Sequence, residues 1–207
     1  PGAFLKNKAF DALANEELFS RSLRLFAAVP GLQTIARHIP GSPFRRRSLP
    51  PIQSRPFRDR IRTLASPPGE GTIRVAYFPG CMTDWLSPEI GESAIRVLRD
   101  RGISVEPIAF LSCCGLPAIN AGRRSAALQM MRQTIAAIEQ ADVDFVVSTS
   151  TSCVNAILND YARLARTPEP WVERAQQAAS KIIDFASFVS RHGVIDNPIK
   201  IVKETVT

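Results

Sequence analysis

The chain has 207 residues, of which 45% are hydrophobic, and carries a net charge of +7. This length can bury one ordinary core plus an appendage. No apolar run approaches the roughly 18 residues of a membrane span, and no signal-peptide pattern opens the chain. We therefore expect a cytoplasmic protein, in a reducing compartment where cysteines bind metal or react more often than they cross-link. The chain starts at Pro1 rather than at a methionine, so we expect that its true start is missing.

The positive charge is concentrated at the N-terminal end. Residues 1–64 carry a net charge of +8, whereas the remaining residues carry −1. The stretch that follows residue 39 is rich in proline, which excludes a continuous helix or a central strand; the prolines are Pro40, Pro43, Pro50, Pro51, Pro56, Pro67 and Pro68. Two regions with different roles are indicated, with a boundary near residue 70.

The N-terminal region predicts helices followed by a basic arm. Residues 9–26 predict one helix with an apolar face, and residues 32–38 predict a second, short one. We expect residues 1–64 to lie on a partner, with Arg45–Arg47 and Arg55–Arg62 facing acidic groups. An acidic protein or an anionic membrane face fits this charge, while a solvated run is the simpler alternative. We expect no nucleic-acid partner, because no recognised binding module accompanies the charge.

From residue 71 onward, strand and helix patterns alternate. Strands are predicted at 73–78, 103–108 and 144–148. Helices are predicted from Pro88, with Ser87 as the N-cap, over 124–140, and from Cys153. This order predicts an α/β fold, a Rossmann-like parallel sheet with flanking helices and right-handed crossovers.

The four cysteines, Cys81, Cys113, Cys114 and Cys153, are the candidate site. Each follows a predicted strand, and the carboxyl ends of parallel strands form the edge where open α/β sheets bind ligands. A disulfide between the adjacent Cys113 and Cys114 would be strained, whereas neighbouring thiolates can reach different iron atoms of one cluster. The sequence therefore predicts that these four residues bind an iron-sulfur cluster.

Other kinds of cysteine site fit the sequence less well. A zinc ion would need four ligands around one centre, and the adjacent Cys113 and Cys114 are an awkward pair for that geometry. A disulfide framework is not expected in a chain with a good apolar core. A catalytic thiol needs a histidine base, but His38 and His192 both lie far from the cysteines in the sequence. Trp85, four residues after Cys81, is predicted to be a core residue; packing beside the cluster is the alternative.

Four motifs of the chain resemble those of cysteine-rich CCG domains, and the resemblance covers about residues 72–192. The motifs are Tyr77-Phe-Pro-Gly-Cys81, Pro88-Glu-Ile-Gly91, Cys113-Cys-Gly-Leu-Pro117 and Ser150-Thr-Ser-Cys153. Such domains occur in heterodisulfide reductase and in the iron-sulfur subunits of glycolate oxidase, anaerobic glycerol-3-phosphate dehydrogenase and lactate-utilisation systems. The resemblance implies a connector or docking arm at 1–70, a CCG domain at 71–195 and the start of a following repeat at 196–207.

The resemblance also implies a function, as an iron-sulfur electron-transfer subunit of a multi-subunit oxidoreductase. The cluster would be of the 4Fe-4S type, with a non-cubane cluster as the alternative. Implied partners are a flavoprotein dehydrogenase for a hydroxy acid or polyol, a ferredoxin-type iron-sulfur protein, a second CCG repeat and a quinone or other carrier. Such a complex could lie peripherally at the inner face of the membrane. Disulfide reduction at the cluster and a cluster-free scaffold are the alternative functions.

The chain departs from the family pattern in three places. The fuller motif ends in CxxC, and its first cysteine is replaced by Ser150; a serine oxygen is a weak iron ligand, so Ser150 is not counted among the ligands. Family members carry a second repeat and, in fused forms, ferredoxin cysteines. Both are absent from these 207 residues, so we expect either a fragment or a protein whose other parts lie on separate chains.

Overall fold

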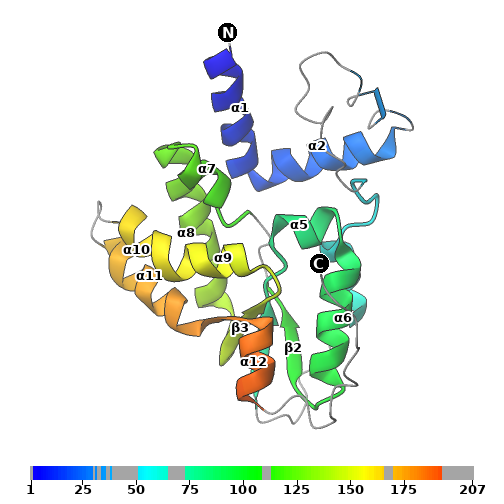
Figure 1. Ribbon diagram of the computed structural model, residues 1–207, viewed down its shortest axis with the longest axis vertical. Helices are drawn as coiled ribbons and strands as arrows, with labels where there is room; N and C mark the ends of the chain where they lie inside the picture. The colour runs from blue at the N-terminus through cyan, green and yellow to red at the C-terminus, as the bar shows by residue number, and fades with distance from the viewer. Residues whose placement is uncertain are drawn as a thin grey trace, which may run out of the picture.

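The computed structural model describes residues 2–29, 31, 34–35, 38, 51–64, 73–108, 113–165 and 170–192. In this part of the chain, a parallel four-stranded sheet is flanked by helices (Figure 1). The strand order is β2-β1-β3-β4, with β1 at Arg74–Tyr77, β2 at Ser104–Pro107, β3 at Phe145–Ser148 and β4 at Ile182–Asp184. The predicted Rossmann-like α/β fold is confirmed.

Alternating side chains of the strands pack into two cores, one on each face of the sheet. Val75 and Tyr77 of β1 face one core, which is covered by α4 (Phe57–Leu64), α6 (Pro88–Arg99) and α12 (Phe185–Arg191). Ala76 and Phe78 belong to the other core. That core is covered by α8 (Arg124–Gln140), α9 (Thr151–Asn155), the π-helical η1 (Ala156–Asp160), α10 (Tyr161–Leu164) and α11 (Pro170–Lys181). Burial on both faces explains the short apolar runs in the two central strands, β1 and β3.

Most elements of the cysteine-rich region lie where the sequence predicts them. Helix α8 has the predicted bounds, and its inward residues Met131, Ile135 and Ile138 are fully buried. Helix α6 begins at Pro88 with Ser87 at the N-cap position, as predicted, although the Ser87 side chain makes no capping hydrogen bond. Strand β4 was not predicted, because three residues are too few to show an alternating pattern.

The predicted helix over 9–26 is instead two helices, α1 (Gly2–Ala14) and α2 (Glu16–Ala28). Asn15 separates them with an extended backbone, and its side-chain oxygen accepts a hydrogen bond from the backbone N–H of Leu18 at 3.0 Å. This is an N-cap, which starts a new helix rather than continuing the old one. Most of the predicted helix at 32–38, and all of Arg45–Arg47, lie outside the described residues.

Helix α4 of the basic arm packs on the chain's own cysteine-rich domain. The Phe57 ring lies so close to Gly91 of α6 that a Cβ atom there would be 2.6 Å from a ring carbon. Arg60 donates to Glu92 at 2.8 Å, and Arg58 pairs with Asp84. The acidic groups that these two arginines face therefore belong to this chain, not to a partner as we expected.

None of the helices in the described segments is long and apolar enough to cross a bilayer.

Candidate metal centre

Cys81 and Cys153 lie at the carboxyl ends of the two central strands, β1 and β3. After β1, α5 (Gly80–Trp85) begins and carries Cys81; after β3, α9 begins and carries Cys153. The chain leaves β1 toward a helix on one face and leaves β2 toward a helix on the other face, so the edge between β1 and β3 is the topological switch point. In open α/β sheets this crevice is where ligands bind.

Gly80 allows the loops after β1 and β3 to touch. Its φ of +66° lies in the left-handed region, which residues with a Cβ atom rarely adopt. A Cβ at this position would lie 3.0 Å from Cys153 Sγ and 3.5 Å from Ser150 Cβ. The glycine before Cys81 is therefore required both by the backbone conformation and by the approach of Cys153.

The adjacent cysteines come from the loop after β2, immediately before α7 (Leu116–Asn120). Cys113 and Cys114 are 2% and 3% exposed. Gly115, which follows them, has a φ of +84°, and a Cβ atom there would lie 3.2 Å from Met130 Cβ on α8. The glycine of the CCG motif thus lets this loop lie directly on α8 and brings both thiols to the crevice.

All four predicted residues are free thiols, and the structure brings them together. Their hydrogen bonds connect Cys81 to Cys113, Cys113 to Cys114, and Cys114 to Cys153. Ser150 Oγ donates to Cys153 Sγ at 3.2 Å. Within the described ranges, no three Cys, His, Asp or Glu side chains are arranged so that they could hold a metal ion.

The shared hydrogen bonds divide the thiols into donors and acceptors. Donation to Cys113, together with burial, raises the pKa of Cys81, and donation to Cys113 and Cys153 raises the pKa of Cys114. Hydrogen bonds from Cys114 and Cys81 lower the pKa of Cys113, and one from Cys114 lowers that of Cys153. Four buried thiolates would repel each other, so protons are shared among them when no cation is bound.

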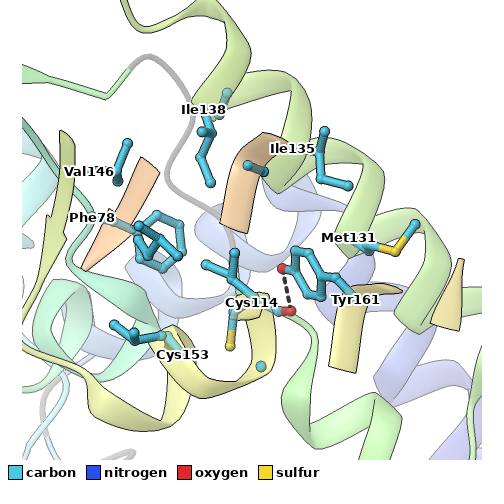
Figure 2. Close-up of a cluster of buried hydrophobic side chains, with 14 of the residues drawn as sticks. Phe78, Cys114, Met131, Ile135, Ile138, Val146, Cys153 and Tyr161 are labelled. Atoms are coloured by element: carbon cyan, nitrogen blue, oxygen red, sulfur yellow. Dashed lines mark hydrogen bonds between the residues drawn. The ribbon is translucent and has the colours of Figure 1, made fainter. Parts of the chain in front are cut away.

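Tyr161 fixes the position of the CC loop and was not predicted from the sequence. Its hydroxyl donates to the Cys114 carbonyl at 2.7 Å, and the side chain is fully buried (Figure 2). Tyr161 directly follows the π-helical segment η1, a rare form that is frequent at functional sites. A tyrosine 47 residues from its partner gives no signal in a sequence, so only the fold could identify it.

Replacing Tyr161 with Phe should lower the free energy of unfolding by about 1–3 kcal/mol, because the Cys114 carbonyl loses its buried donor. Urea denaturation of the metal-free protein measures this change. Tyr77→Phe is the matched control. It also removes a tyrosine hydroxyl, but that hydroxyl forms a hydrogen bond with Thr149 at 2.6 Å and belongs to the other core. An unchanged denaturation midpoint for Tyr161→Phe would show that this hydrogen bond does not hold the loop.

Trp85 lies in the core, and the two histidines are not placed as a catalytic thiol requires. Trp85 is 2% exposed, which agrees with the predicted core role. His192 packs against the rings of Phe188 and Phe145, with ring centroids 4.6 and 5.0 Å away. His38 contacts the Thr34 carbonyl at 2.8 Å. These contacts give no support to a thiol nucleophile with a histidine base.

Comparisons with known proteins identify the region that holds the thiols. A family model described as the CCG cysteine-rich domain matches residues 75–158. Lactate utilization protein A of Exiguobacterium sp. is 32% identical over 115 residues, which cover 56% of this chain and 46% of that protein. Lactate utilization protein A of Bacillus thuringiensis and lactate utilization protein A 2 of Bacillus mycoides are each 30% identical over 117 residues, covering 56% of this chain and 48% of theirs.

The chain thus spans about half the length of the curated relatives it matches. No solved structure gives a significant match. The matched region includes all four cysteines, and its glycines at positions 80 and 115 have the structural roles described above. Residues 75–158 of the chain are thus similar to the CCG cysteine-rich domain.

Proposed function

We propose that Cys81, Cys113, Cys114 and Cys153 bind an iron-sulfur cluster, and that the chain is part of an electron-transfer subunit of a lactate-utilisation oxidoreductase. The observation that carries this proposal is the convergence of four free thiols from three separate segments at the switch point of the sheet. The names of the curated relatives support the link to lactate.

The residues at the site fit such a cluster. Thiolates are soft ligands that suit iron-sulfur clusters, and a cluster offers several iron atoms, so its ligands need not surround one centre as those of a single ion must. Four cysteine ligands match a 4Fe-4S cluster, with a non-cubane form as the alternative. Cys114 and Cys153 also lie within an apolar core that includes Phe78 and Ile108, which keeps water from part of the site.

The chain's own residues would hold and tune the group. Tyr161 fixes the Cys114 backbone, and Ser150 donates to the Cys153 sulfur, a contact of the kind that tunes cluster potentials. The four cysteines would hold the cluster as thiolates, so loading would release the protons of the thiols. When bound, the cluster supplies one-electron redox chemistry.

Oxidation of the substrate is assigned to another chain or domain. No G-x-G-x-x-G follows a predicted strand in the sequence, so no dinucleotide-binding fingerprint is present. We propose that a flavoprotein dehydrogenase supplies the electrons and that a quinone or another carrier receives them. A ferredoxin-type protein and a second CCG repeat are the further proposed partners, in a complex that can lie peripherally at the inner face of the membrane.

Electron transfer is tested by following the reconstituted protein through a redox cycle. After anaerobic loading with iron and sulfide, dithionite should bleach part of the visible absorption, and a soluble quinone analogue should restore it. Absorption that changes irreversibly, or does not change, would contradict an electron-transfer role. A protein that retains no iron at all would instead favour the cluster-free scaffold. The observation that supports this alternative is Ser150, which stands where the fuller family motif has a cysteine.

A further inference from the structure

The last turn of α1 packs directly against the cysteine site. Ala14 is 1% exposed and shares an apolar cluster with Cys113, and Phe10 and Leu13 pack against this cluster together with Cys81. The side-chain amide of Gln129 on α8 donates to the Ala14 carbonyl at 3.1 Å, which satisfies the end of α1. Figure 1 shows α1 and α2 together at one end of the molecule, with α5 below α2 in this view. The end of α1 therefore belongs to the same apolar cluster as Cys113, with Cys81 packed against that cluster.

Helix α2 continues from α1 and is attached through Trp85. The edge of the Phe19 ring meets Trp85 with centroids 6.4 Å apart. The guanidinium groups of Arg24 and Arg58 lie 5.9 and 5.2 Å from the centroid of the same indole. Aromatic and cation-π contacts of this kind are favourable and depend on geometry. Trp85 is therefore the point at which α2, α4 and α5 meet.

Arg58 ties the three helices together by hydrogen bonds. Its backbone N–H donates to Asp84 Oδ1 at 2.9 Å, and its Nε donates to Oδ2 at 2.7 Å. A further guanidinium nitrogen donates to Glu16 in the first turn of α2. Arg24 of α2 donates to both carboxylate oxygens of Asp59, each at 2.8 Å.

A buried ion pair such as Arg58–Asp84 is weak evidence for added stability. Burial raises the pKa of Asp84 even though Arg58 donates to both of its oxygens. Taking two charges out of water costs free energy that their attraction often fails to repay, and a role in fixing one arrangement is the better attested use of such pairs. Arg58 and Asp84 are therefore well suited to set a position.

We propose that α1 and α2 form a fixed cover over the cysteine site, and that Arg58 is the positioning residue that holds the cover in place through Asp84 and Trp85. The short helix α5 carries Cys81 near its start and Asp84 and Trp85 at its end. Asp84 and Trp85, which hold the cover, therefore lie on the same short helix as the Cys81 thiol. Helices α1 and α2 thus shield the site, a role that is separate from docking on other proteins.

A cover of this kind controls how water and small reagents reach the thiols. Solvent exposure is one of the factors that set the potential of an iron-sulfur cluster, and apolar surroundings limit solvent access to metal sites in general. The cover can be tested without a cluster, because its contacts are made by the metal-free chain. The cover can therefore be tested even if the chain binds no cluster.

The test is the rate at which dithionitrobenzoate modifies the thiols of the metal-free full chain. Arg58→Met should raise this rate by about tenfold, because the cover opens more often when its attachment is weakened. Arg60→Met is the matched control: Arg60 lies on the same helix but pairs with Glu92 of α6, so its rate should stay near that of the wild type. Equal rates for wild type and a folded Arg58→Met variant would overturn the proposal.

A milder variant keeps the test decisive if Arg58→Met does not fold. Phe19→Ala removes the edge contact with Trp85 but leaves the Arg58–Asp84 pair intact. It should also raise the modification rate, with a thermal unfolding midpoint close to that of the wild type. A folded Phe19→Ala variant with wild-type thiol reactivity would show that α2 does not hold the cover.

Discussion

Replacing either Cys113 or Cys114 with Ser should abolish the visible absorption of the reconstituted cluster and lower its iron content. Both thiols are buried and hydrogen-bonded to neighbouring cysteines, and a serine oxygen is a poor replacement for a thiolate toward iron. Because metal binding is coupled to folding, the variants should also unfold at lower urea concentration than the loaded wild type. Absorption spectra and iron analysis after anaerobic loading measure both effects.

Ser150→Ala is the matched control for the cysteine variants. It removes the hydrogen bond to Cys153 Sγ, which is 3.2 Å long, but no proposed ligand. The cluster should therefore form, with a shifted reduction potential because a donor to the ligand sulfur is lost. Unchanged iron content in both cysteine variants would refute the ligand assignment, and complete loss of iron in Ser150→Ala would show that Ser150 is itself a ligand.

Gly80→Ala should lower both the stability of the protein and its capacity for iron. The positive φ of Gly80 costs an alanine about 1–2 kcal/mol. In addition, the new Cβ would lie 3.0 Å from Cys153 Sγ, which displaces a proposed ligand. Urea denaturation and iron content after loading separate the two effects.

Gly102→Ala isolates the backbone part of this effect. Gly102 has a φ of +72°, and nothing lies within 4 Å of a Cβ built there. This variant should lose a similar amount of stability but bind iron normally. If both glycine variants bind iron as the wild type does, then Gly80 is needed for the backbone conformation alone, and the contact between the two loops does not shape the site.

The sequence predicted the sheet and its helices where apolar periodicity was long and regular. Helix α8 has 17 residues and the predicted bounds, because its inward residues recur at helical spacing from Leu128 to Ile138. The pair α1 and α2 was misread as one helix, since both carry apolar residues at helical spacing and only the Asn15 cap marks the break. A three-residue strand such as β4 is too short for either pattern.

The cysteines of the site could be predicted because each follows a strand, and parallel strands bring their carboxyl ends to one edge. Residues that support the site could not, because they reach it through the fold. Tyr161 lies 47 residues from Cys114, and Ala14 lies 115 residues from Gln129. Nothing in the local sequence marks these partners.

Charge patterns identify a basic region but not the acids that it meets. The acids opposite Arg58 and Arg60 lie 26 and 32 residues away in the same chain, whereas the excess of positive charge suggested a partner. Net charge reports on long-range attraction, while the choice of an ion-pair partner depends on which helices pack together. The role of Arg45–Arg47, which the structure does not describe, stays a prediction.

The most direct test of the central claim is the content of iron and acid-labile sulfide in the anaerobically reconstituted full chain. The account predicts about four of each per chain, bound only while all four cysteines are intact, as expected for a four-iron cluster with four thiolate ligands. Iron bound without sulfide would indicate a single-metal site. A folded chain that retains neither iron nor sulfide would contradict the claim that these cysteines hold a cluster.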